Sequence, residues 1–281
     1  MYKVAVVGAG IMGSDVALDL ALNNVSVLLK DVSEEKLKIA REKIASNFRM
    51  TKMVKKDIGL NKIDDVLDKI EFTTSYDGFS NLDFVIENVK EVFEVKKEVY
   101  AALDAACGAH TLFAANTSCI SITAIGALLK SPARAIGVHF MNPVPLKPMV
   151  ETIRGFHTSR ETETKMVEFL KHIKKNPVVV NDYPGFVANR ISHLYMNEAA
   201  FVVQDNVASP AQVDSIFKQG YGHAMGPLET ADLIGLDTVL DSIHVLYESY
   251  KDSKFRPCPL LFKMVNAGLL GRKSGQGFYK Y

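Results

Sequence analysis

The sequence lacks several features that would restrict its setting or its partners. Its three cysteines, Cys107, Cys119 and Cys258, have neither an even count nor metal-ligand spacing, so we expect no metal site and a reducing, cytoplasmic setting. The 33 basic and 32 acidic side chains nearly cancel, which argues against nucleic acid or a membrane surface as a partner. No run of about 18 apolar residues is present to cross a bilayer. The first predicted strand begins at Lys3, which leaves no room for a signal peptide.

The 281 residues suit one large domain followed by a smaller one. In the first half, short apolar runs alternate with helical stretches, which is typical of an α/β, Rossmann-type, mostly parallel sheet covered on both faces. The expected strands are 3–7, 25–29, 84–86, 111–115, 135–140 and 177–180. We place the domain boundary near residue 182, with the sheet domain over 1–182 and an all-helical domain over 183–281.

The C-terminal region shows amphipathic helices and no convincing strand. The expected helices are 185–205, 210–218, 227–250 and 259–267. Their apolar stripes must be buried either on the first domain or on another copy of the chain. We therefore expect a homodimer formed through this helical domain.

A charged segment over residues 33–70 is longer than a crossover between two strands needs. Its helical period predicts a helical hairpin inserted into the first domain. A solvated hairpin is the simplest interpretation. A segment of this length could also hold an anionic ligand, with Lys52, Lys55 and Lys56 as candidate contacts.

A glycine-rich turn directly follows the first strand. Gly8 permits a tight turn, Gly10 lets the backbone approach a pyrophosphate, and Gly13 lets the new helix lie close to the strand. Ile11 and Met12 open that helix, whose N–H groups and dipole attract phosphate. The context of strand, turn and helix predicts a dinucleotide site.

Asp31 ends the second apolar run, 18 residues after Gly13. A carboxylate at this place accepts hydrogen bonds from ribose hydroxyls and repels a 2′-phosphate, which favours NAD over NADP. Lys30 beside it is read first as a solvated charge at the edge of the sheet, and second as a phosphate contact.

Polar side chains that follow the strands form the candidate catalytic set. Ser118, His139, Glu151 and Asn189 each have a simple structural explanation, as caps, a core histidine or a surface charge. Oxidation of an alcohol by NAD, however, needs a base, and the ordinary histidine pKa of about 6.5 suits that role. A carboxylate would orient the ring, and hydroxyl or amide groups would polarise the carbonyl.

Six segments of the chain resemble the short, single-function 3-hydroxyacyl-CoA dehydrogenases, nearest to their bacterial and archaeal 3-hydroxybutyryl-CoA dehydrogenases. The segments are GAGIMGS (8–14), NTS (116–118), GVHFMNPVP (137–145), PGFVANR (184–190), GPLE (226–229) and GRKSGQGFY (271–279). They occur in the same order over nearly the whole chain. HFMNPVP and PGFVANR are specific to that family rather than to Rossmann folds in general.

The resemblance implies a role for each matching residue. His139 is the general base and Glu151 the acid paired with it, while Ser118 and Asn189 bind the substrate oxygens. Further positions follow in the same way. Glu91 and Lys96 match cofactor contacts near the nicotinamide ribose, Asn116 and Asn142 line the same pocket unless Asn142 only forms a turn, and the 33–70 hairpin receives coenzyme A.

The implied function is reversible, NAD-dependent oxidation of an L-3-hydroxyacyl-CoA, with short chains such as 3-hydroxybutyryl-CoA preferred, in fatty-acid or butanoate metabolism. The alternatives are a dehydrogenase of a free 3-hydroxy acid and a non-catalytic NAD-binding protein. Three departures from the family pattern are Asp15, Val92 and Cys119. We expect Asp15 on the solvent face of the first helical turn, where it would support the dipole, and Cys119 as a small packing residue.

Overall fold

The computed structural model describes residues 2–55 and 62–281. The chain divides into two compact units, of which the first ends at Tyr183 and the second begins at Pro184. This division lies one residue beyond the predicted boundary. Within the described residues, no helix has both the length and the apolarity that crossing a membrane requires.

The first unit contains a mostly parallel eight-stranded sheet in the order β3-β2-β1-β4-β5-β6-β7-β8, as the sequence predicted for its class. Its strands are β1 (Lys3–Val7), β2 (Ser26–Lys30), β3 (Ile70–Thr73), β4 (Phe84–Glu87), β5 (Leu112–Asn116), β6 (Ala135–Phe140), β7 (Met149–Arg154) and β8 (Asn176–Asn181). Only β6 and β7 pair in antiparallel fashion. The predicted strand list omitted β3, which has only four residues, and β7, whose apolar residues are interrupted by Glu151 and Thr152.

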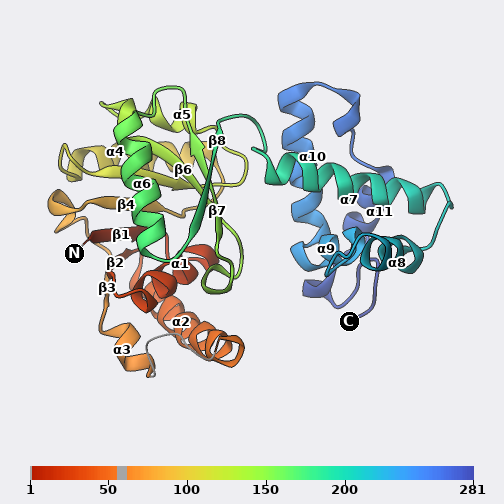
Figure 1. The fold of residues 1–281 in the computed structure, drawn as a ribbon, viewed down its shortest axis with the longest axis horizontal. Coiled ribbons are helices and arrows are strands. Elements are labelled where there is room, and N and C mark those ends of the chain that lie inside the picture. Colours follow the sequence, from red (N-terminus) through yellow and green to blue (C-terminus); the bar gives the residue numbers. More distant parts are fainter. Residues whose placement is uncertain (1, 56–61) are drawn as a thin grey trace. The chain divides into compact units, whose positions relative to one another are not determined.

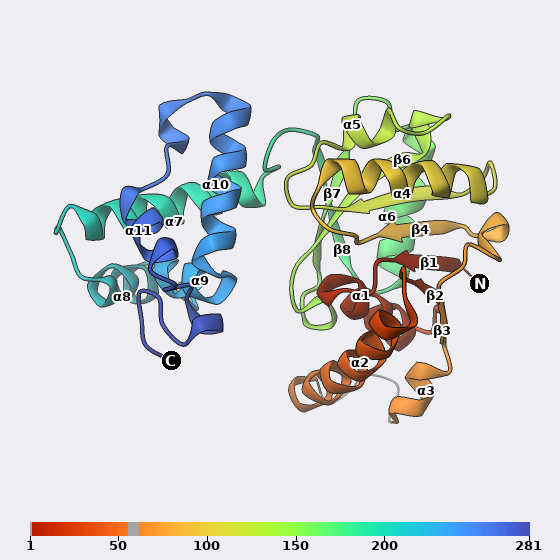
Figure 2. The same cartoon turned by 180° about the vertical axis from the view of Figure 1, so that it is seen from behind.

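Helices cover both faces of this sheet. Figure 1 shows α6 (Arg160–His172) in front of the strands, and Figure 2, from the opposite side, shows α4 (Phe93–Ala106) and α5 (Ile122–Gly126). Helix α1 (Ile11–Leu22) shares one apolar core with α6 and with the strand residues Val4, Val6 and Leu29. The alternation of strand and helix follows from apolar strands that must be buried on both faces.

The 33–70 insertion consists of α2 (Glu34–Val54) and α3 (Ile63–Leu67), followed by the start of β3. The Ser33 hydroxyl accepts from the Lys36 amide and so caps α2. The buried stripe of α2, which includes Leu37, Ile44 and Phe48, joins the core around α1. Lys56, one of the three candidate coenzyme A contacts, lies outside the described residues.

The second unit is helical, with α7 (Ala188–Gln204), α8 (Pro210–Gly220), α9 (Pro227–Ile234), α10 (Leu236–Tyr250) and α11 (Pro259–Asn266). The single helix predicted over 227–250 is wrong. Gly235, with φ of +103°, ends α9 and begins α10. Glycine adopts this conformation readily, and the break lets both helices pack against α7.

Candidate active site

The glycine-rich turn joins β1 to α1 with little space to spare. Gly8 has φ of +96°, and a Cβ on it would lie 2.7 Å from the Asn88 carbonyl. A Cβ on Gly13 would lie 1.7 Å from the Gly8 oxygen, so strand and helix can approach only because both residues lack side chains. A Cβ on Gly10 would meet nothing within 4 Å. The structure itself therefore does not require glycine at position 10, whereas a ligand at the helix N-terminus would.

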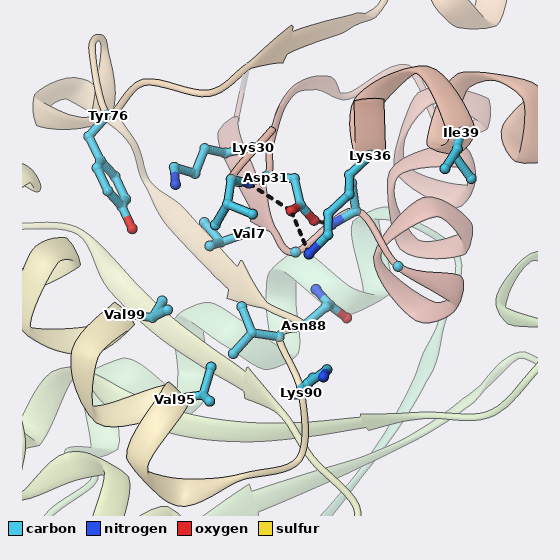
Figure 3. A pocket seen from close by; sticks show the side chains of 15 residues that line it. Val7, Lys30, Asp31, Lys36, Ile39, Tyr76, Asn88, Lys90, Val95 and Val99 are labelled. Carbon is cyan, nitrogen blue, oxygen red and sulfur yellow. Dashed lines mark hydrogen bonds and ion pairs between the residues drawn. The ribbon is translucent and has the colours of Figure 1, made fainter. Parts of the chain in front are cut away.

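A pocket of about 420 Å³ opens beside this turn (Figure 3). Its walls are Val7–Gly10, Lys30–Val32, Lys36, Ile39, Tyr76, Asn88–Lys90, Val95 and Val99. Asp31 Oδ2 accepts from the Ala9 amide at 2.6 Å, and Oδ1 accepts from the Val32 amide at 2.7 Å. The Lys36 ammonium lies 3.7 Å from Asp31 Oδ1. Gly8, Gly10 and Asp31 are thus gathered at one site, as predicted.

Lys30 does not lie where the first interpretation placed it. A solvated edge charge was expected, but Lys30 is 6% exposed and lines the same pocket. Burial lowers the pKa of its ammonium, against the attraction of Asp31.

His139 lies between a carboxylate and a hydroxyl. Its Nδ1 is 3.0 Å from Glu151 Oε2, and its Nε2 is 3.2 Å from Ser118 Oγ. His139 and Glu151 are 7% and 3% exposed. If Nδ1–H donates to the carboxylate, Nε2 carries the lone pair and accepts from the serine. This arrangement suits an imidazole that exchanges a proton at Nε2.

The antiparallel register of β6 and β7 brings this pair together, because His139 lies directly opposite Glu151. Ser118 comes from the loop after β5, the strand on the other side of β6. The connection between β6 and β7 contains the cis peptide Asn142–Pro143. The sequence alone could identify these residues as polar side chains near strand ends, but it could not predict how β6 and β7 align.

Buried Lys175 holds the connection between β6 and β7 in place. Its ammonium donates to the carbonyls of Val144 at 2.6 Å and Lys147 at 3.1 Å, and forms an ion pair with Asp19 of α1 at 2.9 Å. Burial raises the pKa of Asp19 to about 6 despite this cation. The loop between the two candidate catalytic residues is thereby fastened to α1.

Glu91 organises the loop that carries Ser118. Its Oε1 accepts from the amides of Ser118 at 2.8 Å and Cys119 at 3.0 Å, and from the Thr117 hydroxyl. Lys96, also predicted as a cofactor contact, is buried and has carboxylates as partners. The Lys96 side chain is 0% exposed, its ammonium contacts both Glu87 oxygens at 2.9 Å, and Glu91 Oε2 is 3.6 Å away.

The Lys96 ammonium therefore lies between the carboxylates of Glu87 and Glu91. The sequence analysis did not identify Glu87 as a partner of Lys96. Glu87 ends β4 and is buried, and burial raises the pKa of its carboxyl against the attraction of Lys96. An acid at the end of an apolar strand, with a lysine nine positions later, was the available signal.

The two predicted asparagines have different surroundings. Asn116 Nδ2 donates to Asn88 Oδ1 at 2.6 Å, and Asn116 Oδ1 accepts from the Phe140 amide at 3.3 Å. Asn142 is exposed and lines a second pocket, of about 240 Å³, together with Ile11 and residues of α2.

The expectation that Asp15 faces solvent is wrong. Asp15 is 2% exposed and accepts from Asn47 Nδ2 of α2, and burial raises its pKa. The residue faces α2 because that helix covers α1. Lys55, at the end of α2, donates to the Pro145 carbonyl at 2.6 Å, while Lys52 is exposed on α2. Asn189 lies in the first turn of α7 in the second unit, where its carbonyl is 3.0 Å from His193 Nδ1.

Among residues 2–55 and 62–281, no three His, Cys, Asp or Glu side chains gather as metal ligands. The candidate site consists of a pocket beside a helix N-terminus and of three side chains in a row: Ser118 after β5, His139 on β6 and Glu151 on β7.

Comparison with known proteins extends this picture. Residues 3–183 match the model of the 3-hydroxyacyl-CoA dehydrogenase NAD binding domain, and residues 185–281 match that of the C-terminal domain. A Deinococcus radiodurans protein named probable 3-hydroxybutyryl-CoA dehydrogenase is 43% identical over 99% of this chain and 100% of its own length. The 3-hydroxybutyryl-CoA dehydrogenase of Bradyrhizobium diazoefficiens is 42% identical over 99% of this chain and 95% of its own. Among solved structures, the (S)-3-hydroxybutyryl-CoA dehydrogenase of Ralstonia eutropha superposes with a TM-score of 0.94 at 38% identity, covering 100% of this chain and 99% of that one.

Proposed function

We propose that this chain, which belongs to the 3-hydroxyacyl-CoA dehydrogenase family, reversibly oxidises the 3-hydroxyl group of an L-3-hydroxyacyl-CoA to a ketone. The observation that carries the proposal is the placement of His139 between Glu151 and Ser118. The names of the relatives favour a four-carbon acyl group, as in 3-hydroxybutyryl-CoA.

His139 is the proposed general base. In the oxidative direction, Nε2 accepts the proton of the substrate hydroxyl as a hydride leaves the carbon that carries this hydroxyl. Glu151 Oε2, 3.0 Å from Nδ1, keeps the ring in the required tautomer and stabilises the imidazolium that forms. In reduction, the imidazolium returns the proton to the ketone oxygen. When bound, the nicotinamide ring supplies the hydride acceptor at C4.

Ser118 and Asn189 are the proposed substrate-orienting groups. Ser118 Oγ lies 3.2 Å from His139 Nε2. At this separation, the alcohol oxygen of a substrate can lie within hydrogen-bond distance of both atoms. Glu91 fixes the backbone of the Ser118 loop through two amides. Asn189, at the start of α7, is assigned to the substrate carbonyl through the family motif PGFVANR. Its amide would polarise that carbonyl.

The pocket residues fit a bound NAD. The turn without a Cβ at position 10 gives room for a pyrophosphate, and Asp31 faces the same pocket with acceptor oxygens for ribose hydroxyls. The negative charge of Asp31 is our reason for proposing NAD rather than NADP. We also propose Glu91 as a contact near the nicotinamide ribose.

Coenzyme A is assigned to the 33–70 insertion. Lys52, which is exposed on α2, and Lys55, at the end of the same helix, are the described candidates for a phosphate contact.

We also propose a homodimer formed through the second unit. An apolar hollow of about 260 Å³ lies between α7 and α8, and Val207 and Ile216 on it are 75% and 57% exposed. Burying such side chains on another copy would remove them from water. A cytoplasmic setting is proposed from the odd number of cysteines without metal-ligand spacing.

The test is NADH oxidation followed by absorbance with acetoacetyl-CoA and with free acetoacetate. We expect turnover of the thioester, competitive inhibition by coenzyme A, and a kcat/KM for acetoacetate lower by several orders of magnitude. Equal use of the free acid without inhibition by coenzyme A would establish the alternative dehydrogenase. Absence of turnover with either would establish a non-catalytic protein.

A further inference from the structure

Lys30 is a buried cation in the wall of the dinucleotide pocket. It ends β2, it is 6% exposed, and its neighbours in the wall include Val7, Val95 and Val99. The ammonium lies 4.3 Å from the centre of the Tyr76 ring. In Figure 3 it points toward Tyr76 and away from the Asp31 carboxylate. No ion pair of Lys30 with a carboxylate is formed within the described part of the chain.

Such a placement is unfavourable unless something in the pocket compensates it. Removing an ammonium from water is unfavourable, and a single aromatic face compensates for this only in part. Burial accordingly lowers the pKa of Lys30. An ammonium has three donors, and the tyrosine ring satisfies these incompletely. A ligand with an acceptor at this end of the pocket would recover part of the penalty.

The two ends of the pocket differ in chemistry. At one end Asp31 pairs with Lys36 at 3.7 Å and offers carboxylate oxygens that suit hydroxyl groups. The other part of the wall holds Lys30, Tyr76 and, from α4, the valines Val95 and Val99 (Figure 3), which suits a flat apolar group with acceptors on its edge. On the proposed function, Asp31 takes the ribose, so the Lys30 end receives the base.

We propose that Lys30 is a specificity-determining residue that donates a hydrogen bond from its ammonium to a ring nitrogen of the adenine base. Val95 and Val99, one turn apart on α4, cover one face of the base, and Tyr76 holds the ammonium in place. This inference rests on the proposed function and adds to it the group that reads the base.

Calorimetric binding to the Lys30→Met protein tests the inference. Methionine keeps the length and apolar stem of the side chain but removes the donors. We expect the affinities for NADH and for ADP-ribose to fall by the same factor, about 10- to 100-fold. The affinity for reduced nicotinamide mononucleotide, which has no adenine, should stay within about twofold. Lys30→Gln, which keeps a neutral donor, should recover part of the loss.

Lys97→Met is the matched control, since it removes the same charge from α4, next to the pocket, but from a side chain that is 59% exposed and does not line the pocket. Its effect on ADP-ribose affinity should stay below about threefold. Thermal melting of each variant shows whether it folds. An intact Lys30→Met protein with unchanged ADP-ribose affinity would overturn the inference. So would a loss confined to NADPH, which would assign Lys30 to a 2′-phosphate. A wild-type protein that binds neither NADH nor ADP-ribose would instead overturn the proposed function, and this inference with it.

Discussion

His139 and Glu151 lie directly opposite each other across the β6–β7 pair, and Nδ1 of the imidazole is 3.0 Å from Oε2 of the carboxylate. Both side chains come from regular strands, so their separation depends on main-chain register rather than on a loop. The pair leaves Nε2 as the nitrogen that meets Ser118.

Replacing His139 with alanine should abolish most turnover and spare cofactor binding. We expect kcat/KM for acetoacetyl-CoA reduction to fall by at least about 10²-fold, because the proton donor is lost. NADH affinity should not change, since His139 is not among the residues of the dinucleotide pocket. The control is His157→Ala, at an exposed histidine of the same unit, which should keep full activity. Near-normal turnover by His139→Ala would remove this residue from the mechanism.

Glu151→Gln should change the pH profile more than the fold. Glutamine keeps the size of the side chain but removes the negative charge that stabilises the imidazolium. Carbonyl reduction needs the protonated ring, and without that charge the ring loses its proton at a lower pH. The basic limb of the kcat/KM profile for reduction should therefore move to lower pH. A limb at the wild-type position would show that the pair is not used in this way.

Alanine substitutions at Gly10 and Gly13 should have different effects on NADH affinity and on thermal stability. In Gly10→Ala the new Cβ meets nothing within 4 Å, so the melting temperature should be unchanged while NADH affinity falls at least about tenfold. In Gly13→Ala the Cβ would lie 1.7 Å from the Gly8 oxygen, so the melting temperature should fall as well. Calorimetry and thermal melting of both variants measure the two effects. Unchanged NADH affinity in Gly10→Ala would show that no phosphate approaches this turn.

Asp31→Asn should weaken the preference for NAD over NADP. The amide retains one acceptor oxygen, but the charge that repels a 2′-phosphate is gone. The Lys36 ammonium, 3.7 Å from Asp31 in the wild type, then becomes available to that phosphate. We expect the ratio of kcat/KM values for NADH and NADPH to fall at least about tenfold. Adding Lys36→Met should reverse the gain with NADPH, and an unaltered ratio in the single variant would exclude Asp31 as the selector.

Lys175→Met should destabilise the first unit in a pH-dependent way. The change leaves the buried Asp19 without its cation, a loss of about 3–5 kcal/mol in the free energy of unfolding at pH 7. Burial already raises the pKa of Asp19 to about 6, so its ionised form lowers stability as pH rises through that value. Without Lys175 this effect grows, and the difference from wild type should be smaller at pH 5 than at pH 7.

Urea unfolding of Lys175→Met at the two pH values measures the difference. The control is the double variant Asp19→Asn/Lys175→Met, in which the residual loss from the Val144 and Lys147 carbonyls should not vary between pH 5 and pH 7. A pH-independent loss in the single variant would show that Asp19 is not the group responsible.

Local patterns accounted for much of the fold. The bounds of β1 and β6 agree with prediction, because each is a mainly apolar run with polar residues or a turn at its ends. The strand β3 was missed because its residues are partly polar and follow a charged helical segment. The helix break at Gly235 was missed because both flanking segments keep an apolar helical pattern.

Side-chain surroundings were predicted less well than elements. Asp15, Lys30 and Lys96 are all charged residues that the chain buries, and each was expected in contact with solvent or ligand. Their burial depends on partners far away in the sequence or on another element, such as Asn47 for Asp15 and the Tyr76 ring for Lys30. No local pattern contains that information.

The sequence by itself determined the alternation of strands and helices, the glycine turn that admits a phosphate, and the residues available for proton transfer, because these depend on the order and chemistry of neighbouring residues. Only the tertiary structure decided that β6 and β7 run antiparallel with His139 opposite Glu151, and that Lys30 is turned into the pocket. Register and burial result from packing between segments that are distant in the chain, and that packing exists only in the folded molecule.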